Sequence, residues 1–95
     1  MATVVLPRSL VALFPGAERR YEIDGATVAD VIDGLERHVP GMRNRLIDAG
    51  PVLREHLNVF VAGQRGELGT AVPAGATIHF IPAVSGGSMR RGTFG

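Results

Sequence analysis

The sequence contains no cysteine, no lysine and no hydrophobic run long enough to span a membrane. Without cysteine the chain forms no disulfide, offers no thiolate to a metal and has no cysteine nucleophile. The N-terminal residues lack the basic and apolar regions of a secretory signal, so we expect a cytoplasmic protein without membrane contacts. All ten basic residues are arginine, so no side chain can accept an isopeptide bond.

Charge and length limit the function further. A net charge of +1 with scattered arginines is too small for a nucleic-acid-binding surface. A chain of 95 residues that is 45% hydrophobic and 20% charged is typical of one globular domain. We expect a folded domain over residues 1–84 and a flexible tail over residues 85–95.

Hydrophobic periodicity predicts four main strands and one main helix. Thr27 is a helix N-cap with Asp30 three residues later, a weak form of the capping box, and apolar residues then recur at helical spacing up to Val39. A further helical turn is expected at residues 42–47, a turn at 63–66, and a short edge segment around Leu68 and Val72. Strands rich in β-branched and aromatic residues are expected at residues 3–6, 20–23, 57–61 and 77–81.

This order of elements leaves one helix to cover one face of a mixed sheet. The sequence therefore predicts an α+β fold of the β-grasp, ubiquitin-like type, with about four to five strands. Side chains alternate along a strand, which places Phe60 and Ile81 on the face that the helix leaves uncovered. Exposed apolar residues there predict a patch where a partner docks. The alternative is a different register that buries one of them.

A diglycine, Gly86-Gly87, follows the last expected strand after a few residues. Two residues without Cβ atoms can lie flat in a narrow tunnel. The carboxyl group of Gly87 is tied up in a planar amide with Ser88, so the diglycine can react through that group only after residues 88–95 are removed.

The chain resembles the ThiS/MoaD family of ubiquitin-like sulfur carriers. Residues 58–64 are similar to the central strand and turn of that family, residues 35–42 to the end of its helix, and residues 72–87 to its C-terminal signature. The insert at residues 43–55 looks closer to MoaD and the cysteine-biosynthesis carriers than to the shorter thiamin carriers.

The resemblance implies a carrier that acts as a substrate and is not an enzyme. An E1-like enzyme would adenylate the carboxylate of Gly87 with ATP. Gly86, which also lacks a Cβ atom, would keep the end of the chain narrow where it enters the enzyme. A sulfur donor would convert the adenylate to a thiocarboxylate, which a biosynthetic enzyme would consume to make cysteine, molybdopterin or another sulfur-containing metabolite. A JAMM-type zinc protease would first cut between Gly87 and Ser88.

Two other functions remain open: a ubiquitin-like modifier joined to proteins through Gly87, and an interaction module whose tail never reacts. Neither a metal nor a bound cofactor is expected. The three histidines lack ligand spacing, and no glycine-rich loop follows a strand to bind phosphate, so ATP would be bound by the partner.

Overall fold

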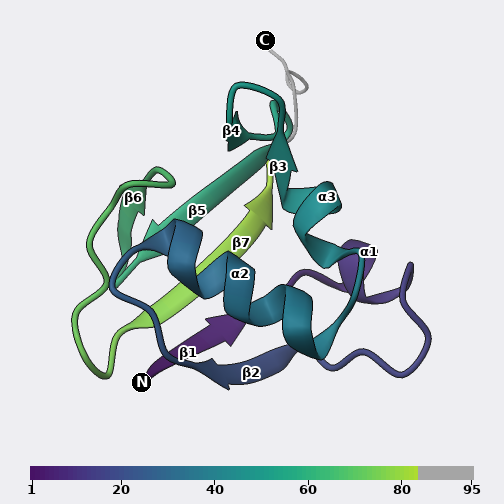
Figure 1. Ribbon diagram of the computed structural model, residues 1–95, viewed down its shortest axis with the longest axis horizontal. Coiled ribbons are helices and arrows are strands. Elements are labelled where there is room, and N and C mark those ends of the chain that lie inside the picture. Colours follow the sequence, from purple (N-terminus) through teal and green to yellow (C-terminus); the bar gives the residue numbers. More distant parts are fainter. Residues whose placement is uncertain (84–95) are drawn as a thin grey trace, which may run out of the picture.

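A mixed five-stranded sheet carries one long helix on one face in the computed structural model, which describes residues 1–83 (Figure 1). The strand order is β2-β1-β7-β5-β6, with β1 parallel to β7 and the other neighbours antiparallel. This is the predicted α+β arrangement. The strands of the sheet are β1 (Ala2–Val5), β2 (Arg20–Ile23), β5 (Leu57–Val61), β6 (Gln64–Gly66) and β7 (Thr77–Pro82).

The remaining elements lie beside this sheet. A short helix α1 (Arg8–Val11) occupies the connection from β1 to β2, and α3 (Met42–Leu46) follows the main helix α2 (Val28–His38). Two short strands, β3 (Ile47–Asp48) and β4 (Val52–Leu53), pair antiparallel with each other. Within residues 1–83 no helix is long and apolar enough to cross a membrane.

The core lies between α2 and the sheet. Each fully buried aliphatic or aromatic side chain contributes about 1.5–3 kcal/mol relative to an exposed one, so this single layer supplies most of the stability. Its largest fully buried members come from the apolar stripe of α2, from α3 and from the inner face of the sheet: Phe80, Leu6, Ile32, Leu35, Met42, Leu46, Ile78, Val4, Val28, Val31 and Val59.

The start of α2 is held by its own cap and by a loop. The capping box is complete: Thr27 Oγ1 accepts from the backbone N–H of Asp30 at 3.3 Å, and Asp30 Oδ2 accepts from the N–H of Thr27 at 3.2 Å. The first backbone N–H groups of a helix have no partner within it. Here the N–H groups of Val28 and Ala29 donate to carbonyls of residues 70 and 68, in the loop after β6.

Two expectations for the segment after β5 were wrong. Residues 63–66 do not form the turn, because the chain reverses at Ala62 and Gly63, both with positive φ, and β6 then pairs with β5. The short edge segment expected around Leu68 and Val72 does not join the five-stranded sheet. Its backbone groups instead bond to the start of α2 and to Ala26, apart from one bridge between Thr27 and Ala71.

Glu36 joins α2 to α3. Its carboxylate accepts from the backbone N–H groups of Gly41 and Arg43, each at 2.9 Å. Gly41 adopts a left-handed φ of 97°, which lets the chain turn sharply between the helices. Both hydrogen bonds lower the pKa of Glu36 below its usual value of 4.5, and the bond from Gly41 has the larger effect.

Gly34 allows α2 to approach the sheet closely. A Cβ atom at this position would lie 2.5 Å from Cγ2 of the buried Ile23. Alanine would add about 1 kcal/mol of helix propensity, but overpacking costs about 1–3 kcal/mol. The net expectation is that Gly34→Ala loses up to about 2 kcal/mol of unfolding free energy, measured by urea denaturation. Gly69→Ala, where a Cβ meets open space, should shift stability by less than about 0.5 kcal/mol. If Gly34→Ala is more stable than wild type, the Ile23 side chain can move away from the added Cβ atom at little cost.

The lowered pKa of Glu36 predicts a pH-dependent stability. Because the folded pKa lies below the unfolded one, the stabilisation is fully present above pH 4.5 and is lost as the pH falls through the folded pKa. Glu36→Gln should therefore melt at a lower temperature than wild type near neutral pH, and this difference should shrink on acidification. Thermal melts from about pH 7 to about pH 2.5 test this. The same change at exposed Glu67 should leave the melting temperature unchanged, and a constant difference for Glu36→Gln would assign its effect to packing.

Candidate docking surface and C-terminal tail

The register between β5 and β7 decides which side chains face outward. Val59 lies opposite Phe80, and both are buried beneath α2. The neighbouring pair, Asn58 and Ile81, points to the other face, where 44% of Ile81 is exposed. Phe60 also points there and is half-buried. The structure thus places both predicted docking residues on the uncovered face.

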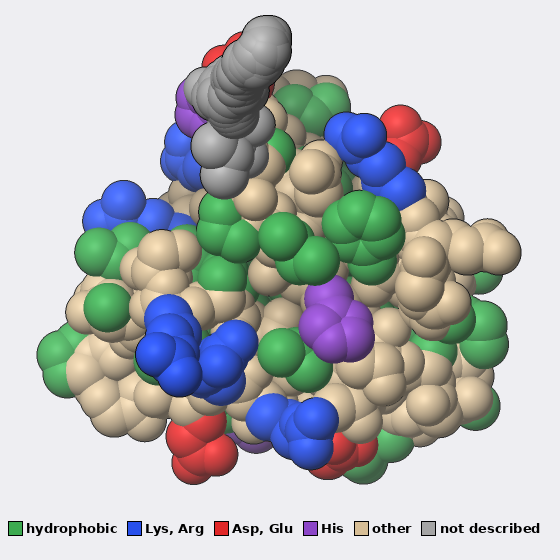
Figure 2. Space-filling model, turned by 180° about the vertical axis from the view of Figure 1, so that it is seen from behind, with side chains coloured by type: hydrophobic (Ala, Val, Ile, Leu, Met, Phe, Trp, Pro, Cys, Tyr) green, Lys and Arg blue, Asp and Glu red, His purple; other side chains and the backbone are tan. Residues whose placement is uncertain are grey.

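One row of side chains crosses this uncovered face from edge to edge. The strand registers pair Arg20 with Val5, Val5 with His79, His79 with Phe60, and Phe60 with Arg65. An apolar and aromatic centre is therefore flanked by an arginine at each sheet edge, with a histidine between. Figure 2 shows this face, where hydrophobic side chains gather around one histidine and arginines lie toward the rim.

Sequence reasoning found one member of this row, Phe60, and the nearby Ile81, but not the arginines at its ends. Arg20 and Arg65 are far apart in the chain, and only the full strand order shows that they belong to one row. The acidic Glu22 on this face already accepts a hydrogen bond from the Thr3 hydroxyl at 2.8 Å. The row is therefore suited to an apolar partner surface with acidic groups at its margins.

The end of β7 is anchored where the tail begins. Pro82 lies opposite Leu57, and the backbone N–H of Ala83 donates to the carbonyl of His56 at 2.9 Å. The direction of the chain is thereby fixed two residues after Ile81. Gly86, Gly87 and Ser88, the predicted reactive and processing residues, lie outside the described residues, as does the proposed domain boundary after residue 84.

A small cleft of about 320 Å³ adjoins this anchor point. Arg45, Arg54 and His56 line it together with Pro82. Arg54 is positioned by a 2.8 Å hydrogen bond from Nε to the carbonyl of Asn44. Asp48 and Glu55 also line this cleft, Asp48 at 3.9 Å from Arg54 and Glu55 at 3.5 Å from His56, so groups of both charge signs adjoin Pro82.

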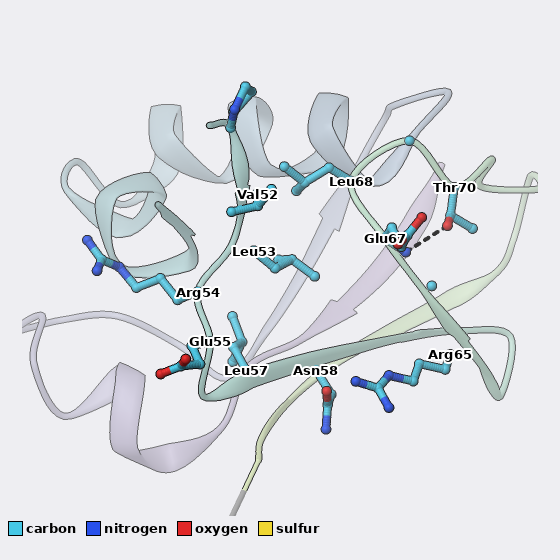
Figure 3. A pocket seen from close by; sticks show the side chains of 13 residues that line it. Val52, Leu53, Arg54, Glu55, Leu57, Asn58, Arg65, Glu67, Leu68 and Thr70 are labelled. Atoms are coloured by element: carbon cyan, nitrogen blue, oxygen red, sulfur yellow. Dashed lines mark hydrogen bonds between the residues drawn. The ribbon is translucent and has the colours of Figure 1, made fainter. Parts of the chain in front are cut away.

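A larger cleft of about 830 Å³ opens between the β4 segment and the loop after β6 (Figure 3). Val52, Leu53 and Leu68 point toward its interior, and the loop is braced by a 2.7 Å hydrogen bond from the Glu67 N–H to Thr70 Oγ1. Arginines and glutamates from the same segments also line it. The sequence did not indicate this cleft, because two irregular segments form it together.

Residues 1–83 contain no group of three or more histidine, aspartate or glutamate side chains placed to hold a metal ion. His38 lies against the ring of Tyr21 with centroids 5.5 Å apart, and His56 pairs with Glu55 at 3.5 Å. His79 belongs to the row on the uncovered face.

A helix-covered mixed sheet of this order, with a diglycine beyond its last strand, defines a β-grasp protein of the ubiquitin-like carrier class. The chain belongs to the ThiS family, which matches residues 8–87. It is 38% identical to small archaeal modifier protein 1 of Haloferax volcanii over 69 residues, which are 72% of this chain and 79% of that protein. It is 30% identical to the sulfur carrier protein CysO of Mycobacterium tuberculosis over 91 residues, 90% of this chain and 97% of CysO.

Solved structures give the same assignment. A chain in the crystal structure of the Amycolatopsis orientalis BexX/CysO complex superposes with a TM-score of 0.79 at 33% identity, covering 92% of this chain and all of that one. The crystal structure of SAMP1 from H. volcanii superposes with a TM-score of 0.70 at 32% identity, covering 90% and 98%. These relatives are named as carriers and modifiers and not as enzymes.

Proposed function

We propose that this chain is a sulfur carrier that works through the carboxylate of Gly87. Removal of residues 88–95 frees that carboxylate, an E1-like enzyme adenylates it with ATP, and a sulfur donor converts it to a thiocarboxylate. A biosynthetic enzyme then takes the sulfur. The chain itself binds no nucleotide in this scheme and acts as a substrate for each partner.

One observation carries the proposal: the ThiS family match ends at Gly87, the second residue of the diglycine. Residues 88–95 lie beyond the match and include Arg90, Arg91 and Phe94. Such side chains do not fit a channel shaped for two glycines. Cleavage between Gly87 and Ser88, by a JAMM-type zinc protease, is therefore the first step of the scheme.

Phe60 and Ile81 are proposed to dock the activating enzyme. They lie beside each other on the face without a helix, and Ile81 is two residues before the anchored start of the tail. A partner seated on this patch is therefore close to the point from which the diglycine extends. Arg20 and Arg65 at the ends of the row would meet acidic groups on that partner.

We expect Ile81→Asp to abolish adenylation while leaving the fold intact. An unpaired charge in the centre of an interface typically costs ~2–5 kcal/mol of binding, whereas Ile81 is too exposed to contribute much to the core. ATP–pyrophosphate exchange with the activating enzyme measures the first effect, and thermal melting measures the second. Leu13→Asp is the control, because Leu13 is 50% exposed but lies in the connection between α1 and β2 and not on a strand of the sheet. A large loss of stability for Ile81→Asp would remove Ile81 from the docking surface.

We expect the full-length chain to be inert with activating enzyme and ATP, and a chain ending at Gly87 to be adenylated. In the full-length chain the Gly87 carbonyl is an amide, and the carboxylate of Gly95 follows two arginines and a phenylalanine. With a sulfur donor, the shorter chain should exchange one oxygen for one sulfur. Intact-mass spectrometry of both forms is the measurement. Comparable adenylation of the full-length chain at Gly95 would exclude the trimming step.

A protein modifier is the second candidate, favoured by the 38% identity to small archaeal modifier protein 1. In that case the activated Gly87 forms an amide with a lysine of a target protein. Material isolated from the native cell separates the functions. A thiocarboxylate at Gly87 supports the carrier, adducts on target lysines support the modifier, and intact Gly95 termini alone support an interaction module that never reacts.

A further inference from the structure

The two edges of the sheet differ in what lies beside them. At one edge β6 is short, and the chain turns back directly after it: the N–H of Glu67 donates to Thr70 Oγ1 at 2.7 Å, and the N–H of Thr70 donates to the carbonyl of Glu67. At the other edge β2 is the outermost strand, and no strand of residues 1–83 pairs with its outer side (Figure 1). An unpaired edge strand is a template for pairing with another chain.

The register with β1 shows which backbone groups of β2 point outward. The N–H of Leu6 donates to the carbonyl of Arg19 at 2.7 Å. Because the bonds of an antiparallel ladder fall on alternate residues, Tyr21 also bonds to β1. The N–H and C=O groups of Arg20 and Glu22 therefore point away from the sheet. They can pair with an added strand, and β2 contains no proline, glycine or lysine that would oppose it.

The side chains at these two outward positions carry opposite charges. Arg20 and Glu22 are both exposed, and both lie on the uncovered face of the sheet, opposite Val5 and Thr3. The Thr3 hydroxyl holds Glu22 there by donating to Oε2 at 2.8 Å. A carboxylate has about four acceptor positions, so Glu22 can accept from a second donor. Arg20 makes no ion pair with any of the described residues.

We propose that β2 is a self-complementary edge that joins two copies of this chain. In an antiparallel pair centred on Tyr21, Arg20 of each copy lies opposite Glu22 of the other, and the backbones of each such pair exchange two hydrogen bonds. The twofold symmetry makes this ion pair twice. A register moved by two residues would set Arg20 opposite Arg20 or Glu22 opposite Glu22, which is unfavourable. The charges therefore select one register, with a second copy as the partner.

Tyr21 would lie on the symmetry axis, on the face that α2 covers. Its half-buried ring lies against His38 with centroids 5.5 Å apart, and its hydroxyl accepts from the N–H of Glu18 at 2.8 Å. Two aromatic side chains directly opposite each other across an antiparallel pair make a favourable contact. Because each ring is already held by its own chain, little side-chain freedom is lost when the two rings meet.

The joined sheet would run continuously through both copies, with the twofold axis perpendicular to it. Both α2 helices then lie on one face, and both uncovered faces lie on the other. The two β7 strands end at opposite ends of the joined sheet, because the copies are antiparallel. Phe60 and Ile81 stay open in the dimer, whereas Arg20 is used by the pairing. The inference does not depend on the proposed function.

Sedimentation equilibrium of the full-length chain tests the self-association. The average mass of wild type should rise from one chain toward two as the concentration increases from about 10 μM to about 1 mM, the affinity range of small interfaces. Glu22→Arg sets like charges opposite each other in both pairs and should raise the dissociation constant roughly tenfold, and Arg20→Glu should do the same. The double variant Arg20→Glu/Glu22→Arg restores both pairs with the signs exchanged and should associate as wild type does.

Two control substitutions lie elsewhere on the sheet. Arg65→Glu reverses a charge at the opposite edge, and Ile81→Asp alters the uncovered face. Neither should change the dissociation constant, and a loss of association in either would place the interface away from β2. Thermal melts verify that every variant is folded.

An introduced cysteine reports the register, because the natural sequence contains none. In the proposed pair the two Tyr21 Cα atoms face each other at about 4.5 Å, within the range that a disulfide spans. With oxidised glutathione as the oxidant, Tyr21→Cys should form a covalent dimer faster than Ala74→Cys, at an exposed loop position. The inference is overturned if wild type stays monomeric at the highest concentration, if the double variant does not recover association, or if the two cysteine variants cross-link equally fast.

Discussion

The antiparallel register between β5 and β7 is the constraint on which the rest of the structure depends. Because side chains alternate along each strand, a shift by one residue would send Phe60 into the core and Val59 to the surface. The observed register buries Val59 opposite Phe80, exposes Ile81 opposite Asn58, and places Leu57 opposite Pro82. The same pairing thus fixes the core, the candidate docking surface and the starting point of the tail.

The helix covers one face of this sheet and thereby separates stability from recognition. Core residues of α2, α3 and the inner strand positions account for the burial, while the uncovered face carries half-buried apolar residues, exposed arginines and the exposed Ile81. Substitutions on the two faces should therefore have separable effects. A substitution at Gly34 changes packing beneath the helix and so changes stability. A substitution at Ile81 should change stability little, because this side chain is largely exposed in the folded state. This separation lets a small domain retain its fold while its open face is adapted to a partner.

Sequence reasoning succeeded where one local pattern decides the outcome. The apolar stripe that follows Thr27 predicted α2, and the diglycine after a strand rich in β-branched residues indicated the family. It failed where contacts between distant segments decide. Residues 64–66 became a strand because the chain reverses one step earlier, at Ala62 and Gly63. Glu36 has the position of a solvated helix residue, yet it accepts two backbone hydrogen bonds from the next segment. That Arg20 and Arg65 stand at the two ends of one row follows only from four strand registers taken together.

In the proposed function the carrier has to leave one partner before it can serve the next. It visits an activating enzyme and then an acceptor, and both need the tail that leaves β7 beside Ile81. Rapid release from the first partner is then as important as recognition, and the acyl group must survive the transit.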